Sequence, residues 1–236
     1  MALLSTRDMV GLAPGWDRDC LEEFEGRMTD QQRPFPCIFG VEAVLRGTLR
    51  YAFVHGAEQS EQLAEHLRVF TEQCKELGKR TSVVCFFEEW AEEKSHDAYF
   101  THFWELLRET SELDPLPWPT EFSRSTSESS FEYCFNGQAM FVVVNTNLHQ
   151  ARRSRAFSRV AITFQPRFVF DDLGEGTKQG DEARRLIRTR VEEYDDTALT
   201  GHLGSFGSDE NREWKQYYLD DGVEIPAIQK CPVHNF

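Results

Sequence analysis

Residues 131–170 read FEYCFNGQAMFVVVNTNLHQARRSRAFSRVAITFQPRFVF. This stretch opens with two apolar runs, Phe131 to Phe135 and Gln138 to Val144, which flank the dipeptide Asn136-Gly137. Asn-Gly between two strand-like runs is the strongest short signal for a β-hairpin with a two-residue turn. We therefore expect a hairpin at the centre of the fold.

More strands are expected on both sides of this hairpin. Val160 to Phe164 is an apolar run of strand length, and Phe168 to Phe170 is expected to add a further strand piece. Ser82 to Phe87 is continuously apolar, as in a strand covered on both faces. Thr48 to Val54 alternates instead, and the alternation places three side chains on one face: Leu49, Tyr51 and Phe53.

Helices are expected between and after these strands. Ala57 to Leu77 carries apolar residues at spacings of three and four, Ser95 can cap a second helix, and Asp181 to Tyr194 is amphipathic. The last helix should point its arginines outward and its apolar side chains inward, namely Ala183, Leu186, Ile187, Val191 and Tyr194. The alternation of strands and helices favours an α/β fold, bordering on α+β, with a mixed sheet flanked by helices.

The composition limits the classes of function. The chain has 236 residues, of which 40% are hydrophobic, so it can bury a core, and we expect one domain over residues 1–236. Lys and Arg number 26 against 40 acidic residues, a formal net charge of −14. Binding to a nucleic-acid backbone or to an anionic membrane surface is therefore not expected, whereas a cationic substrate is easily accommodated.

The chain carries no signal for export or membrane insertion. The first residues lack the apolar core of a signal peptide, and no apolar run approaches the roughly 20 residues that span a bilayer. The 6 cysteines form no C-x-x-C pair, so neither a disulfide framework nor a cysteine-rich zinc site is indicated. We expect a cytoplasmic protein.

One histidine and a cluster of arginines follow the hairpin. His149 stands just ahead of a cluster that comprises Arg152, Arg153, Arg155 and Arg159, and Arg167 closes the next apolar run. Guanidinium groups bind carboxylates or phosphates bidentately, which indicates an anion site with an imidazole close by. The alternative is a surface turn whose arginines pair with the many carboxylates elsewhere.

Two cysteine positions are candidates for chemistry. Cys37 follows a proline at the start of an expected helix, where the helix N-terminus favours thiolate, although a buried core cysteine is the alternative. Cys231 and His234 lie three residues apart near the C-terminus and could be metal ligands.

Taken together, several motifs resemble one protein family over nearly the whole chain. They are FPCIFG at 35–40, GTLRYAFV at 47–54, FNGQAMFVVVNTNLHQARRSR at 135–155, FQPR at 164–167 and CPVH at 231–234. The sequence resembles the YqcI/YcgG family. That family includes haem-dependent N-hydroxylases of guanitoxin biosynthesis, and the haem enzyme that hydroxylates the guanidino group of arginine in D-cycloserine biosynthesis is similar to it.

The resemblance implies a haem-binding domain and gives the candidate residues roles. His149 is then the expected axial ligand of the iron, and Cys37 is the alternative ligand. The haem propionates would bind arginines, for which the candidates are Arg152, Arg153, Arg155 and Arg167. Aromatic side chains would line the porphyrin, for which the candidates are Phe141, Phe164 and Phe168. A cationic substrate would bind carboxylates, for which the candidates are Glu42, Glu132 and Asp171.

The implied activity is N-hydroxylation of a guanidine or an amine. O2 would be activated at the haem with electrons from an external reductase, and the protein would supply the ligand, the pocket and the substrate's placement. A homodimer is compatible with this function. A haem carrier or sensor without turnover is the alternative function, and an interaction protein without cofactor is the third.

Overall fold

The computed structural model describes residues 3–173, 177–200 and 212–222. Within them a five-stranded sheet has the order β1-β2-β5-β4-β3. Its first two strands are parallel, and all other neighbours are antiparallel, so the sheet is mixed and the predicted α/β fold is confirmed. The strands are β1 (Leu49–Val54), β2 (Ser82–Phe87), β3 (Tyr133–Phe135), β4 (Gln138–Asn145) and β5 (Val160–Pro166).

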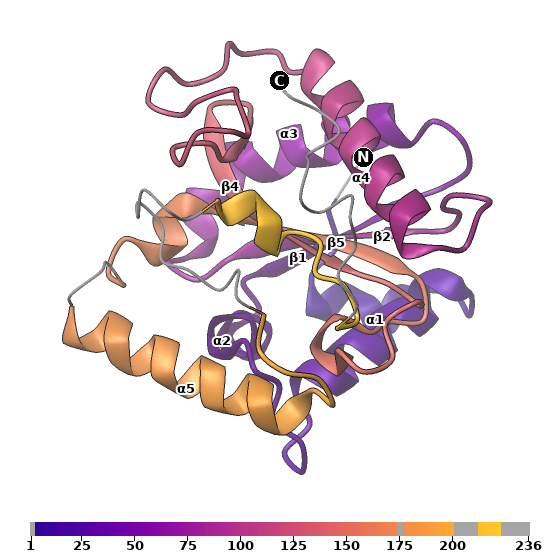
Figure 1. Ribbon diagram of the computed structural model, residues 1–236. Coiled ribbons are helices and arrows are strands. Elements are labelled where there is room, and N and C mark those ends of the chain that lie inside the picture. The colour runs from indigo at the N-terminus through magenta and orange to yellow at the C-terminus, as the bar shows by residue number, and fades with distance from the viewer. Residues whose placement is uncertain (1–2, 174–176, 201–211, 223–236) are drawn as a thin grey trace.

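Helices cover both faces of the sheet (Figure 1). One face packs against α3 and α4, and the other packs against α1 and α2, while α5 lies alongside α2. These helices are α1 (Trp16–Met28), α2 (Ile38–Arg46), α3 (Gln59–Leu77), α4 (His96–Glu112) and α5 (Lys178–Tyr194). Four short 3-10 helices complete the described elements: η1 (Thr6–Gly11), η2 (Arg153–Arg155), η3 (Arg167–Phe170) and η4 (Glu213–Gln216). No helix among the described residues combines the length and the apolar character needed to cross a bilayer.

The Asn-Gly hairpin is confirmed. Phe135 pairs with Gln138, and both turn residues have positive φ, 48° at Asn136 and 72° at Gly137, as a type I′ turn requires. The carboxylate of Asp114 accepts the backbone N–H of Asn136 at 3.0 Å. The hairpin is thus tied to the end of α4.

The alternation in β1 divides its side chains as predicted. Leu49, Tyr51 and Phe53 belong to the core beneath α1 and α2, whereas Ala52 and Val54 belong to the core beneath α3 and α4. The cap at Ser95 is also confirmed, since its hydroxyl accepts the N–H of Ala98 at 3.2 Å.

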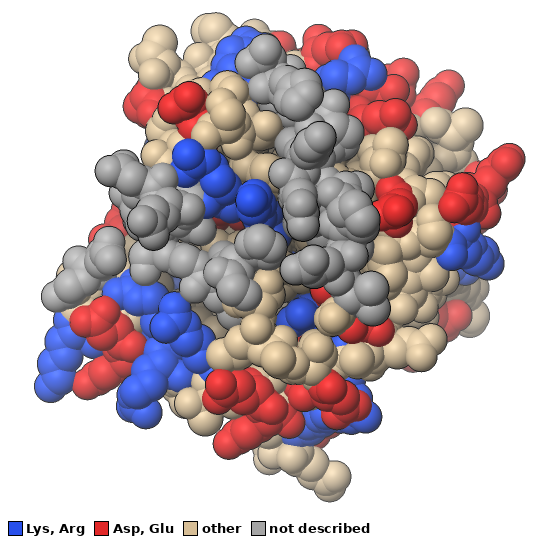
Figure 2. All heavy atoms as spheres, in the orientation of Figure 1, with Lys and Arg blue, Asp and Glu red and all other residues tan. Residues whose placement is uncertain are grey.

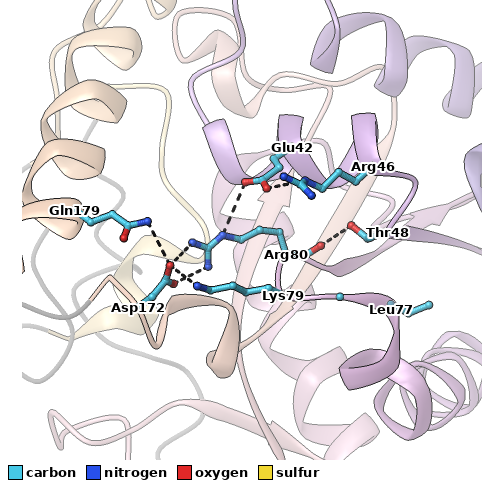
Figure 3. A pocket seen from close by; sticks show the side chains of 9 residues that line it. Glu42, Arg46, Thr48, Leu77, Lys79, Arg80, Asp172 and Gln179 are labelled. Carbon is cyan, nitrogen blue, oxygen red and sulfur yellow. Dashed lines mark hydrogen bonds and ion pairs between the residues drawn. The ribbon is translucent and has the colours of Figure 1, made fainter.

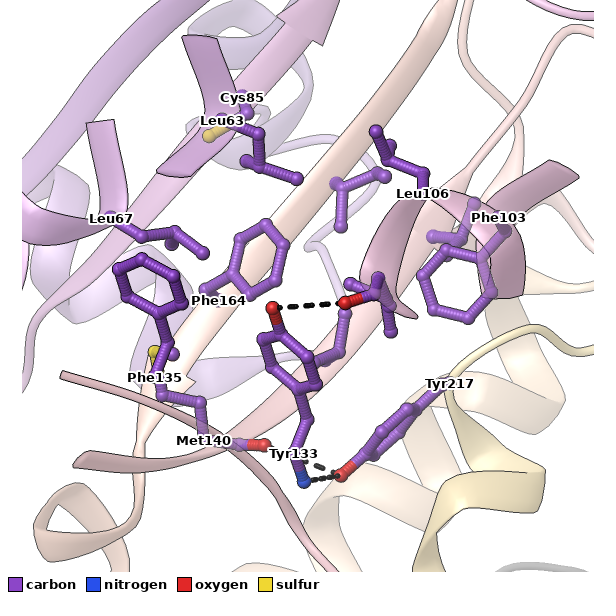
Figure 4. Close-up of a cluster of buried hydrophobic side chains, with 14 of the residues drawn as sticks. Leu63, Leu67, Cys85, Phe103, Leu106, Tyr133, Phe135, Met140, Phe164 and Tyr217 are labelled. Carbon is purple, nitrogen blue, oxygen red and sulfur yellow. Dashed lines mark hydrogen bonds between the residues drawn. The ribbon is translucent and has the colours of Figure 1, made fainter. Parts of the chain in front are cut away.

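The larger core lies between the sheet and the helix pair α3 and α4 (Figure 4). A tyrosine from the C-terminal part of the chain, Tyr217, enters it and is fully buried. Its hydroxyl accepts the N–H of Tyr133 at 3.2 Å and lies 3.3 Å from the carbonyl of Met140. Tyr133 and Met140 are partners at the end of the β3–β4 pairing away from the turn, so that end is bound to a residue distant in sequence.

Two local predictions are wrong. Phe168–Phe170 is not a strand but part of η3, because Pro166 ends the ladder with no N–H to donate, and Arg167 then turns towards buried carboxylates. Leu186 does not point inward; its exposed fraction is 39%, and it borders a shallow hollow between α2 and α5. The outward position of the α5 arginines is confirmed at Arg185 and Arg188, on the helix where Figure 2 shows basic side chains gathered.

Candidate functional site

The loop between β4 and β5, residues 146–159, carries the histidine and most of the arginines. It is pinned to itself: the N–H of Thr146 donates to the carbonyl of Arg155 at 2.9 Å, and the N–H of Phe157 donates to the carbonyl of Thr146 at 3.0 Å. The side chain of Asn145 also donates to the carbonyl of Ser154. The loop is therefore a fixed platform rather than an open turn.

Residues 212–222, which we call the strap, lie against this platform (the yellow segment in Figure 1). β3 pairs with residues 138–140, so among the described residues the remainder of β4 has no strand beside it on that edge. The N–H of Val144 donates there to the carbonyl of Tyr217 at 2.9 Å. Trp214, Tyr217 and Tyr218 of the strap are buried. The strap thus takes the place of a neighbouring strand along β4.

His149 is buried between the platform and the strap. Its Nε2 lies 2.6 Å from the carbonyl of Leu219, so Nε2 carries the proton, and Nδ1 accepts from the hydroxyl of Thr146 at 2.8 Å. Burial is the main reason that the pKa of His149 falls from 6.5 to about 4. The imidazole is therefore neutral at physiological pH, which is the form that binds metal ions.

A second histidine lies beside it. The rings of His96 and His149 are 5.0 Å apart between centroids, and Nδ1 of His96 is 2.8 Å from the hydroxyl of Tyr218. Burial lowers the pKa of His96 as well. No pattern in the sequence links His96 to His149, because His96 is simply the first residue of α4.

Two of the predicted arginines form a cationic centre, in which Arg152 is buried and Arg155 is half-buried. Arg155 donates to the carbonyls of Gln216 and Tyr217 at 3.1 and 3.2 Å, and Arg152 donates through Nε to the carbonyl of Asp220 at 2.6 Å. Burial and the charge of Arg152 lower the pKa of Arg155 to about 10. Among the described residues no carboxylate lies within ion-pair distance of Arg155, so its charge is met by backbone dipoles.

Two aspartates that sequence analysis missed hold the platform in place. Asp221 of the strap accepts the backbone N–H groups of residues 150–152, the shortest at 2.6 Å from Arg152. Burial alone would raise the pKa of Asp221, but these three donors outweigh it and the pKa is lowered. Asp195 accepts both the N–H and the hydroxyl of Ser154.

Arg167 lies apart from this centre and pairs with two carboxylates. Its Nη1 is 2.6 Å from Glu132 and 3.1 Å from Glu213, the first residue of η4. Glu132 is completely buried, and its second oxygen has no hydrogen-bond partner among the described residues. Burial, reinforced by Glu213, raises the pKa of Glu132, so this carboxyl holds a proton.

Cys37 caps α2, and its Sγ accepts the N–H of Gly40 at 3.3 Å. The expectation of a thiolate is not met, because burial raises the pKa of the thiol more than the helix N–H groups lower it. Cys37 and Arg155 nevertheless lie close enough to interact electrostatically. The structure therefore gathers His149, Arg152, Arg155 and Cys37 into one neighbourhood.

The other candidates lie outside it or have structural partners. Arg153 is 41% exposed and pairs with Asp196, while Asp171 is exposed. Phe141 packs on Tyr217, with ring centroids 5.5 Å apart, Phe164 is buried in the core, and Phe168 packs against that core. Cys231 and His234 lie outside the described residues.

Glu42 lines a separate cavity of about 620 Å³ near the ends of α2 and α3 (Figure 3). Its charged groups are paired with one another: Glu42 with Arg46 at 2.8 Å, and Asp172 with both Arg80 at 2.8 Å and Lys79 at 2.7 Å. Arg80 is almost fully buried within this network. The pairs join α2, the start of β2 and the chain after η3, which is a structural role.

The fold and site define a mixed α/β protein with a buried histidine and arginine centre closed by a C-terminal strap. The chain belongs to the YqcI/YcgG family, whose model matches residues 24–234. Two relatives from Bacillus subtilis (strain 168), the uncharacterized proteins YqcI and YcgG, are 37% and 38% identical over 93% of this chain and 88% of theirs.

A third relative carries the name of an activity. The "Putative N(omega)-hydroxy-L-arginine synthase DcsA" of Streptomyces lavendulae is 32% identical over 87% of this chain and 79% of its own. No solved structure matches the chain.

Proposed function

We propose that this protein is a haem-dependent oxygenase that N-hydroxylates a guanidine or an amine. The name of the Streptomyces relative supports the reaction type, since a hydroxyarginine synthase forms an N–O bond on a guanidino group. The observation that carries the proposal for this chain is the neutral, buried imidazole of His149 beside two guanidinium groups, those of the buried Arg152 and the half-buried Arg155. These are the donor types that an iron porphyrin with two propionates requires.

The residues present fit haem, provided that one hydrogen bond is exchanged. His149 would bind iron through Nε2, which now donates to the carbonyl of Leu219. Its proton would then reside on Nδ1 and be donated to the hydroxyl of Thr146, which can accept as readily as it donates. That hydroxyl already accepts the N–H of Leu148 at 3.1 Å, so it is held in position.

The arginines would bind the propionates. Arg155 has five N–H donors and uses two of them on backbone carbonyls, and its charge has no carboxylate partner among the described residues. A propionate would supply the missing negative charge through charge-assisted hydrogen bonds, which are about twice as strong as those to a neutral carbonyl. Cys37, held as a thiol by burial, is the weaker candidate ligand.

The haem, when bound, would supply the activation of O2. One oxygen atom would enter an N–H bond of the substrate and the other would leave as water, with two electrons from an external reductase and two protons. The protein would contribute the ligand, exclude water and orient the substrate. Glu132 remains a candidate for contacting the substrate, because one of its buried oxygens has no hydrogen-bond partner within the described residues. It would do so as a neutral hydrogen-bonding group rather than as a counter-charge, since burial raises its pKa and it holds a proton.

The test is product formation by haem-loaded protein with O2, an electron donor, and arginine or simple guanidines. We expect a hydroxylated product that carries label from isotopically labelled O2, and loss of that product in His149→Gln. Arg159→Gln is the matched control, because Arg159 belongs to the same loop but donates to Glu88 and stacks on Trp16. Haem binding with no product from any of these substrates would contradict the oxygenase and favour the carrier or sensor.

A further inference from the structure

The strap supplies the present partners of the proposed cofactor ligands. Leu219 provides the carbonyl that binds Nε2 of His149, and Asp220 provides the carbonyl that binds Nε of Arg152. These two bonds use the atoms that an iron and a propionate would need. The same nitrogen cannot donate to a carbonyl and bind a metal, so the two arrangements are alternatives.

The two halves of the strap are held differently. Residues 213–218 are anchored in the core: Tyr217 is completely buried, and the indole of Trp214 donates to the carbonyl of Thr126 at 2.7 Å. Leu219 is still buried, whereas Asp220 and Asp221 are half-buried and Gly222 is exposed. The end of the strap can therefore detach without moving Trp214 or Tyr217, although this exposes Leu219.

The side chain of Asp221 fastens the end of the strap to the platform. Its carboxylate accepts the N–H groups of Gln150, Ala151 and Arg152 at 3.0, 3.0 and 2.6 Å. The neighbouring carboxylate of Asp220 accepts the N–H of Gly222 at 2.8 Å, and among the described residues it has no hydrogen bond to the platform. Within that part of the chain, Asp221 is thus the fastening and Asp220 is not.

We propose that residues 219–222 form a latch that closes over His149 and Arg152 in the haem-free chain, and that latch closure and iron ligation by His149 exclude each other. This inference rests on the proposed function. Residues 213–218 remain docked in both states. Opening the latch costs the three hydrogen bonds of Asp221 and the burial of Leu219. The haem's own bonds to His149 and Arg152 replace those that the carbonyls of Leu219 and Asp220 lose.

The test combines hydrogen exchange with the rate of hemin uptake by the full chain. We expect hemin to bind and the amides of residues 150–152 to lose protection as it does, because they lose Asp221. Asp221→Ala should take up hemin about tenfold faster, the size expected when charge-assisted hydrogen bonds are removed. Asp220→Ala is the matched control and should behave as wild type. Asp221→Asn, which keeps one acceptor oxygen, serves if the alanine variant does not fold.

The outcomes separate the latch from the function. Hemin binding with unchanged protection at 150–152, and with equal uptake rates in wild type and Asp221→Ala, overturns the latch and leaves the haem proposal standing. Uptake by Asp221→Ala but not by wild type supports the latch as a barrier. Failure of both proteins to bind hemin overturns the latch together with the proposed function.

Discussion

The fold holds His149 as a buried, neutral ring between the carbonyl of Leu219 and the hydroxyl of Thr146. Burial lowers its pKa to about 4, although the hydrogen bond to the carbonyl of Leu219 by itself would raise the pKa. The difference between this pKa and the ordinary value of 6.5 has a measurable effect on stability.

We predict that His149 makes the protein less stable as the pH falls from 6.5 towards 4. In this range the unfolded chain binds a proton that the folded chain does not, so each step down in pH favours unfolding. The shift corresponds to at most about 3 kcal/mol. Urea unfolding near neutrality and near pH 4.5 measures the free energy of unfolding at each pH. The loss of stability between the two should be smaller in His149→Gln than in wild type. His55→Gln, at an exposed histidine, should keep the wild-type loss, and equal losses in all three proteins would contradict the prediction.

Glu132 should act in the opposite direction. Its pKa is raised by burial and by Glu213, so above its ordinary pKa near 4.5 the folded chain holds a proton that the unfolded chain releases. The contribution of Glu132 to the free energy of unfolding is therefore fully present at low pH and declines as the pH rises. We expect wild type to be less stable at pH 9 than at pH 6. Glu132→Gln, which mimics the neutral carboxyl, should lose less stability over the same pH range. The exposed Glu128→Gln is the control; an identical decline in Glu132→Gln would refute this account of Glu132.

At the scale of elements, local sequence predicts best where one residue type forces one geometry. The Asn-Gly turn could be predicted because only such residues tolerate positive φ at both turn positions, and Ser95 because its hydroxyl suits a helix N-terminus. The strand expected at Phe168–Phe170 does not form, because strand propensity contains no information about the buried carboxylates that bind the neighbouring Arg167. Arg167 meets Glu132 and Glu213 there, and that interaction draws the chain out of the sheet.

The turn yields a prediction with an internal control. Gly137→Ala should destabilise the protein by about 1 kcal/mol or more, because alanine is strained at a φ of 72°. Gly26→Ala, in α1 with open space at its Cβ position, should stabilise by up to about 1 kcal/mol. Thermal or urea unfolding of both variants measures the difference. A Gly137→Ala variant as stable as wild type would show that this turn conformation is not required.

At the scale of the whole molecule, the candidate centre is assembled from segments that are distant in sequence. Cys37 comes from the start of α2, His96 from the start of α4, and Asp195 from the end of α5. The loop at 146–159 meets them, and the strap closes the centre. The motif predicted the loop's residues because they are contiguous, whereas Asp195, Asp221 and the strap have no periodicity that links them to it. Their burial was signalled only by the aromatic cluster at Trp214, Tyr217 and Tyr218.

The charge of the whole chain has a related consequence. A protein with a formal net charge of −14 places a buried arginine, Arg152, beside a half-buried one, Arg155. Arg155 has no carboxylate within ion-pair distance among the described residues. An acidic chain with such a cationic centre is compatible with a cationic substrate and an anionic cofactor in one molecule. The cofactor is the part of this account on which the rest depends.

The visible absorption spectrum tests it most directly. We would record the ferric, ferrous and ferrous-carbonyl forms of protein produced with haem precursor, alongside His149→Gln and Cys37→Ser. The account predicts a stoichiometric Soret band in wild type, a carbonyl band at the position typical of an imidazole ligand, loss of both in His149→Gln, and retention in Cys37→Ser. A protein that stays colourless after hemin addition, or a thiolate-type carbonyl band that disappears in Cys37→Ser, would contradict it.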